Sequence, residues 1–156
     1  ADIAAPNDVF YIGGTKCGGM MGEAIVISDA GLKTDFKYHL KQRGALTLKG
    51  RSLGIQFHGL LQNNLIFDLA AHANHMAAKL SDAFHKQGYS MLIESDTNQI
   101  FPIIPDNMVS RLQEDYGVLV WQTLDDGKTA VRFITSWATP EEEVERFIVY
   151  LANLSD

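Results

Sequence analysis

A single lysine near the start of the chain, Lys16, lies in the glycine-rich segment GGTKCGG, with an apolar run on each side. If this segment is an ordinary surface turn, the ammonium group stays in water and has no chemical role. A phosphate-binding loop would need a glycine directly before the lysine and a serine or threonine directly after it. Thr15 and Cys17 occupy these positions, which excludes that loop. The third interpretation is an imine-forming lysine, because neighbouring apolar strands would desolvate the amine and favour its nucleophilic, neutral form.

An arginine in the second half of the chain is a further candidate. On an expected strand, Val131 and Phe133 share one face, while Arg132 and Ile134 share the other. Arg132 is either a solvent-facing strand residue or, because an arginine among apolar neighbours needs a partner, paired with another polar group.

Other residues with possible chemistry have simpler interpretations. His72 and His75 are spaced as in some metal sites, but no third or fourth ligand is evident, so we expect solvated helix histidines and no metal. Cys17 could be a reactive thiol beside a lysine, although a small residue filling a tight turn is the simpler interpretation. Trp121 and Trp137 are expected to be core or interface aromatics.

The elements that would position these residues begin with two strands and three helices. The strands are short apolar runs bounded by glycines, which is typical of strands covered on both faces. The third helix is long, begins at Asn63 or Asn64 and ends at Gly88, and a helix of this length often connects two domains. The other expected elements lie at residues 9–12, 24–27, 35–42 and 51–61.

After Gly88 the pattern becomes that of a compact α+β unit. We expect strands at 91–93 and 100–104, then a helix from Asp106 that stops before Gly117. A hairpin follows, with its turn at 125–127. In the last helix, Thr139 is expected to act as N-cap in a capping box. The predicted domains are therefore 1–75 and 76–156.

Composition limits the classes of function. The chain has 156 residues, of which 46% are hydrophobic, and a net charge of -6, without a cluster of basic residues. Because phosphate contacts need clustered lysine and arginine, we expect no nucleic-acid partner. One cysteine allows no internal disulfide framework, and no apolar run is long enough to cross a bilayer. We therefore expect a soluble, cytoplasmic protein without a membrane partner.

Three segments together carry a family resemblance. DVFYIGGTKCGGMMGEAIVI, at residues 8–27, resembles the cofactor-lysine segment of the threonine aldolase and β-eliminating lyase family of pyridoxal-phosphate enzymes. LKGRSLGIQF is similar to a glycine- and arginine-bearing helix start of that family, and AVRFITSWATPEEEVERF to its C-terminal strand and helix. The three segments occur in family order and span most of the chain.

The resemblance implies roles for four residues and a cofactor, pyridoxal 5'-phosphate. Lys16 is implied to form the imine with the cofactor, and Thr15 either bonds its phosphate or only closes the turn. Arg132 is implied to hold the α-carboxylate of a small amino-acid substrate, which a planar, bidentate guanidinium suits. Arg51 either lies near the cofactor phosphate or is a solvated first-turn arginine.

The same family uses an aspartate, a stacking histidine and a phosphate loop upstream of the lysine, where only fifteen residues stand here. We therefore expect an α/β fold corresponding to the C-terminal half of a fold-type-I enzyme, namely the end of the large domain followed by a small α+β domain. The implied activity is aldol cleavage of threonine-like β-hydroxy amino acids to glycine and an aldehyde, by a homodimer or homotetramer when full length. The isolated chain is expected to be inactive. The alternatives are β-elimination from a β-substituted amino acid, or a non-enzymatic α+β interaction module.

Overall fold

The computed structural model describes residues 3–154, and the chain divides into two compact units after Ile66. The division falls near the start of the long helix α3 (Leu65–Lys86), which also contains the predicted domain boundary after residue 75. We call the part up to Ile66 the first unit and the part from Phe67 the second unit. Within the described residues, no helix has the length and apolar character needed to cross a membrane.

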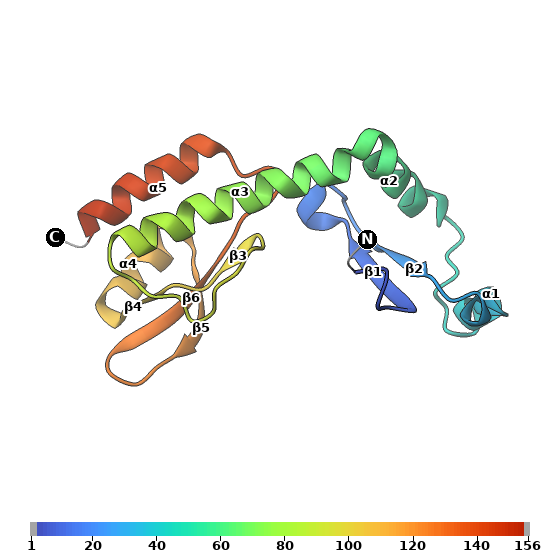
Figure 1. The fold of residues 1–156 in the computed structure, drawn as a ribbon, viewed down its shortest axis with the longest axis horizontal. Helices are drawn as coiled ribbons and strands as arrows, with labels where there is room; N and C mark the ends of the chain where they lie inside the picture. Colours follow the sequence, from blue (N-terminus) through green and yellow to red (C-terminus); the bar gives the residue numbers. More distant parts are fainter. Residues whose placement is uncertain (1–2, 155–156) are drawn as a thin grey trace. The chain divides into compact units, whose positions relative to one another are not determined.

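The first unit contains one small sheet and several helices (Figure 1). Its strands pair antiparallel, with Val9 opposite Ile27 and Gly13 opposite Glu23, and the glycine-rich segment connects them. Its elements are β1 (Val9–Gly13), η1 (Thr15–Cys17), β2 (Glu23–Ile27), η2 (Gly31–Lys33), α1 (Phe36–Gln42), α2 (Arg51–Leu61) and η3 (Gln62–Asn64).

The prediction that both strands are covered on both faces is wrong for this chain. In the first unit β1 and β2 pair only with each other, and Val9, Tyr11 and Ile25 on one face of the hairpin are exposed. Few elements of the first unit remain to cover a two-stranded sheet, and an isolated hairpin of this kind is marginally stable in water. The strands are apolar enough for burial on both faces, but within this chain one face of the hairpin stays exposed.

Two asparagines break the chain direction between α2 and α3. Asn63 and Asn64 have φ values of 52° and 62°, in the left-handed region that asparagine tolerates better than most residues. These residues separate α2 from α3, which begins at Leu65, as the predicted cap at Asn63 or Asn64 indicated.

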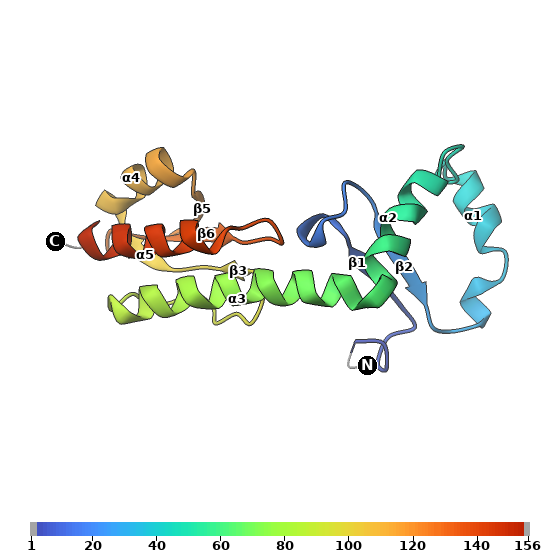
Figure 2. The ribbon, with the colours of Figure 1, turned by 90° about the horizontal axis from the view of Figure 1, so that it is seen from above.

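The second unit is an antiparallel sheet covered by helices. The central strand β6 (Lys128–Ile134) pairs with each of the other three strands. In both views of the ribbon α3 and α5 lie side by side (Figures 1 and 2), and the Lys79 ammonium of α3 forms ion pairs with Glu141 and Glu145 of α5. The remaining elements are β3 (Gln99–Ile100), β4 (Ile103–Pro105), α4 (Asp106–Tyr116), β5 (Leu119–Thr123) and α5 (Glu141–Leu154).

A hydrophobic core fills the second unit. Its most enclosed side chains come from three helices and two strands, and include Phe84, Ile104, Leu112, Val131 and Leu151. The Phe84 ring contacts the rings of Tyr89, Phe133 and Phe147. This unit therefore has the core that a stable domain requires.

Three details of the second unit differ from the prediction. The expected strand at 91–93 is only a bridge between Met91 and Pro102, and the strand at 100–104 is divided into β3 and β4. The division falls at Pro102, because proline has no N–H to donate to the strand ladder. The Thr139 hydroxyl accepts a hydrogen bond from the Ser136 N–H at 2.8 Å, on the strand side of the turn. The capping box had predicted a bond from a backbone N–H of the first helical turn instead.

Candidate functional site

Lys16 lies in a single turn of 3₁₀ helix that the surrounding glycines make possible. The Gly14 carbonyl accepts hydrogen bonds from the N–H groups of Cys17 at 3.0 Å and Gly19 at 2.8 Å. Gly18 has a φ of 92°, which side chains rarely permit. A Cβ atom at Gly19 would lie 3.0 Å from backbone atoms of Gly14. The turn is therefore closed so tightly that only glycine fits at this approach.

Helix α2 holds this turn from one side. The Gln56 side-chain oxygen accepts hydrogen bonds from the backbone N–H groups of Met20 at 2.7 Å and Met21 at 3.3 Å. The buried Phe57 ring lies against Gly14, where an added Cβ would be 3.1 Å from Phe57 Cζ. Neither contact was predicted from the sequence, although both residues belong to the segment that resembles the family helix start. Their contacts fix the backbone around Lys16.

The side chains of Lys16 and Thr15 are exposed on this turn. Within residues 3–154, no hydrogen bond or ion pair involves either side chain, so both remain available to a ligand. The first unit by itself does not desolvate the Lys16 amine. Burial raises the pKa of the Cys17 thiol, which keeps the thiol protonated at neutral pH and disfavours a reactive thiolate.

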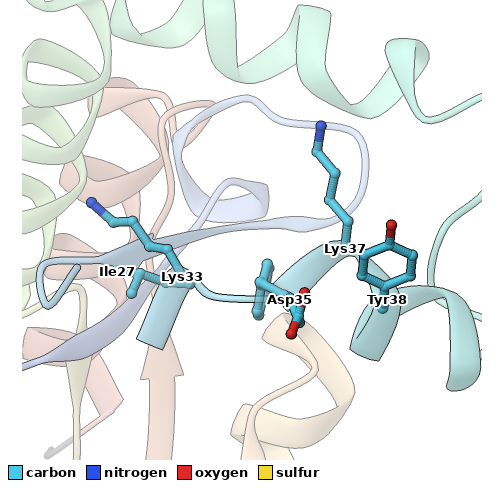
Figure 3. Close-up of a pocket in the computed structure, with 6 residues that line it drawn as sticks. Ile27, Lys33, Asp35, Lys37 and Tyr38 are labelled. Atoms are coloured by element: carbon cyan, nitrogen blue, oxygen red, sulfur yellow. The ribbon is translucent and has the colours of Figure 1, made fainter. Parts of the chain in front are cut away.

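Arg51 is the first residue of α2, the helix whose next turns hold the lysine turn. Its exposed side chain lines an open hollow of about 530 Å³ together with Leu48, Lys49, Ser52 and Ile55. A second hollow is lined by Ile27, Phe36 and charged residues of the α1 region (Figure 3). In Figure 3 the ammonium groups of Lys33 and Lys37 point in different directions and away from the Asp35 carboxylate, so these charges do not converge on a ligand.

Arg132 lies in the second unit, on β6 opposite Leu119 of β5. Its neighbours Val131 and Phe133 pack with the core, so Arg132 lies on the other face of the strand, as the alternation predicted. The Arg132 Nε atom is buried and has no hydrogen-bond partner within the described part of the chain. A buried donor without a partner is costly, which marks this atom as a candidate for ligand contact.

Trp121 contacts Arg132, and this contact was not predicted from the sequence. The guanidinium carbon lies 5.2 Å from the centre of the Trp121 ring, within the range of a cation–π contact. Trp121 is 52% exposed and does not belong to the core. The predicted hairpin places Trp121 and Arg132 on paired strands. This pairing is the one sequence signal that could have suggested their contact.

The helix histidines do not form a metal site with their neighbours. His72 Nε2 lies 2.8 Å from the Thr139 carbonyl oxygen, which connects α3 to the turn before α5. The structure contains no group of three or more candidate metal ligands among residues 3–154. His72 is thus part of a helix contact and His75 is exposed.

Comparison with solved structures defines the class of fold. The whole chain superposes on a threonine aldolase from Leishmania major with a TM-score of 0.94 and 45% sequence identity, and covers 46% of that chain. The α/β fold class predicted from the sequence is therefore confirmed.

Comparison with curated proteins also finds similarity to threonine aldolases. Over 138 residues the chain is 34% identical to a low specificity L-threonine aldolase from a Pseudomonas species and 33% identical to one from Pseudomonas aeruginosa. Each match covers 88% of this chain and 39% of the relative. No protein-family model matches the chain. The chain is a homologue of threonine aldolases, as the resemblance indicated, and it spans less than half the length of these relatives.

Proposed function

We propose that this chain is the C-terminal part of a pyridoxal-phosphate-dependent threonine aldolase that cleaves β-hydroxy amino acids to glycine and an aldehyde. The observation that carries the proposal is the match over the whole chain, at 45% identity, to a threonine aldolase. In this proposal the first unit is the end of the large domain and the second unit is the small domain. The full-length protein forms a homodimer or homotetramer in the cytoplasm.

The chemical character of the described residues fits the cofactor. Lys16 provides a primary amine on a turn that α2 holds in place, and Thr15 and Arg51 provide donors of the kind that bind a phosphate group. When bound, pyridoxal phosphate supplies an aldehyde that condenses with a primary amine and a ring that withdraws electrons from the bonds at Cα. The glycines on both sides of Lys16 let the backbone approach a planar group closely.

Arg132 is proposed to bind the substrate. Its guanidinium presents several N–H donors in one plane, which matches the two oxygens of a carboxylate. The buried Nε without a partner supports this role, because a bound carboxylate would supply the missing acceptor. Arg132 thereby anchors the substrate during cleavage. In that reaction the Cα–Cβ bond of the substrate breaks, the β-hydroxyl loses its proton and Cα gains a proton.

Two alternatives remain as outcomes of experiment. A β-eliminating enzyme would expel the β-substituent of its amino-acid substrate with a proton, and water would convert the product into ammonia and an oxo acid. It would form no glycine from threonine. An interaction module would need neither the lysine nor the cofactor. The relatives named as threonine aldolases favour aldol cleavage over both.

Borohydride labelling of the full-length protein tests the role of Lys16. After incubation with pyridoxal phosphate and reduction, we expect the mass label on Lys16, and both the label and threonine cleavage to be lost in Lys16→Ala. Lys33→Ala is the matched control, because Lys33 is an exposed lysine of the same unit and lies outside the glycine-rich turn. A label that persists in Lys16→Ala would contradict the assignment.

Arg132→Ala tests carboxylate binding. Because hydrogen bonds to charged groups contribute about 1.5–3 kcal/mol, we expect KM for threonine to rise about tenfold to hundredfold. The affinity for the cofactor should stay close to that of the wild type, as measured by the absorbance of the bound cofactor. Equal losses of cofactor and substrate affinity would argue against a carboxylate site.

A further inference from the structure

The Arg132 guanidinium contacts an aromatic residue from the neighbouring strand. The Arg132 side chain is half-buried, its Cζ lies 5.2 Å from the centre of the Trp121 ring, and its Nε has no partner within the described residues. Stacking on a ring uses the face of the guanidinium and leaves the N–H groups along its edge free. These free donors are the ones that a bidentate carboxylate needs.

A β-bulge brings Trp121 to this position. Val120 pairs with Val131, but Gln122 and not Trp121 pairs with the next residue, Ala130. Trp121 is therefore the extra residue of β5, while Leu119 remains opposite Arg132. A bulge leaves one residue outside the ladder and redirects its side chain. In the regular register Trp121 would instead lie opposite Ala130.

A second aromatic ring contacts Trp121. The Phe101 ring lies 5.1 Å from the Trp121 ring, at an interplanar angle of 58°, and comes from the short segment between β3 and β4. Leu92 donates its N–H to the Phe101 carbonyl at 2.8 Å, which fixes the backbone of that segment. Phe101, Trp121 and Arg132 thus form a row of contacts within the second unit.

We infer that Trp121 is a positioning residue, which holds the Arg132 guanidinium in place so that its N–H groups present two donors to the substrate carboxylate. This inference rests on the proposed function, because it assumes that Arg132 binds the carboxylate. In this role Trp121 acts through Arg132 and not on the reacting atoms. Its contribution should therefore appear in the binding of the carboxylate and not in the chemical step.

A spectroscopic experiment tests the stack without any activity. In the ¹⁵N-labelled chain, the Arg132 Nε–H signal is assigned by its loss in Arg132→Lys. We expect this signal to be shifted by the ring current of Trp121, to return to the position of the other arginines in Trp121→Ala, and to keep most of its shift in Trp121→Phe. An unchanged Arg132 signal in Trp121→Ala would overturn the inference.

Kinetics of the full-length protein test the positioning role. We expect Trp121→Ala to raise KM for threonine about threefold to thirtyfold, the range of a cation–π contact, with kcat nearly unchanged. Trp121→Phe should restore most of the affinity. Val120→Ala is the matched control, because Val120 is a similarly exposed residue of β5 that pairs with Val131.

A pair of ligands separates positioning from a general structural effect. Glycine carries a carboxylate and methylamine does not, so Trp121→Ala should weaken glycine binding and leave methylamine binding unchanged. Equal weakening of both ligands would overturn the inference.

The outcomes also distinguish failure of the positioning role from failure of the proposed function. If Arg132→Ala raises KM but Trp121→Ala does not, only the positioning role fails. If the wild type neither cleaves threonine nor binds glycine, the proposed function fails and the positioning role fails with it. The ring-current shift of the Arg132 signal can still be observed in that case, because it reports only the contact with Trp121.

Discussion

Lys16 and Arg132 differ in how much of their surroundings this chain provides. Arg132 has an aromatic ring over its guanidinium and a buried Nε, so the second unit already shapes its environment. The Lys16 side chain is exposed, and only the backbone around it is fixed. Since an imine-forming amine needs a site with little water, we expect the remaining surroundings of Lys16 to come from outside the first unit.

A tyrosine far from either residue gives a prediction at the residue scale. The Tyr150 hydroxyl of α5 donates a hydrogen bond to the Asp115 carboxylate of α4 at 2.6 Å. This bond, together with burial and the negative charge of Asp115, raises the pKa of Tyr150 from 10.0 to about 12. In a titration of tyrosine absorbance, we expect one of the five tyrosines to ionise late, and Asp115→Asn to remove this late step.

The same shift gives the sign of a pH effect on stability. Because the folded protein holds the Tyr150 proton more tightly than the unfolded chain, the contribution is fully present below pH 10 and disappears as the pH rises towards about 12. Tyr150→Phe should therefore flatten the fall in the free energy of unfolding over this range, as measured by urea unfolding. The same fall in both proteins would contradict the assignment.

At the scale of elements, helix α2 and the glycine-rich turn form one structural feature. Gln56 accepts two backbone hydrogen bonds and Phe57 fills the space beside Gly14, so the helix fixes a loop that is distant in sequence. The segment that resembles the family helix start therefore also supports the lysine turn. Sequence resemblance alone does not distinguish this supporting role from a direct role in binding.

Two glycine substitutions test this feature. Gly19→Ala places a Cβ atom 3.0 Å from the Gly14 backbone, whereas Gly13→Ala has no atom within 4 Å of its new Cβ. Because the backbone must move, we expect Gly19→Ala in the full-length protein to lower the free energy of unfolding by about 1–3 kcal/mol and to slow borohydride labelling of Lys16. Gly13→Ala should change neither quantity appreciably. Similar effects of both substitutions would show that the close approach is unimportant.

At the scale of the molecule, the two units differ in how well they are buried. The second unit has a continuous core around Phe84, Leu112 and Leu151. The first unit leaves apolar residues of both its strands exposed, including Val9, Tyr11 and Ile25. Large exposed apolar areas in a soluble protein often mark surfaces that contact another part or partner. This contrast agrees with the proposal that the first unit is one end of a larger domain.

Hydrogen exchange of the isolated chain tests this contrast. We expect amides of β4 and β6, such as those of Ile104 and Val131, to exchange slowly and those of β1 and β2 to exchange rapidly, because protection follows burial. In the full-length protein β1 and β2 should become protected. Equal protection of both units in the isolated chain would show that the first unit is stable by itself.

The sequence by itself determined the types and approximate limits of most elements and the residues that carry the proposed chemistry. Apolar periodicity and glycine positions are local signals, so α2, α4 and the hairpin turn were predicted close to their observed limits. Local signals also identified the turn at Lys16 and the face of β6 that bears Arg132.

Only the tertiary structure determined which residues support Lys16 and Arg132. The bulge at Trp121 depends on how β5 aligns with β6, and the contacts of Gln56 and Phe57 depend on how α2 packs on a distant turn. Likewise, the apolar pattern of β1 and β2 indicated burial, but burial is a property of what surrounds a strand and not of the strand itself. Such contacts join residues far apart in sequence, and their energies therefore leave no periodic signal in the local pattern.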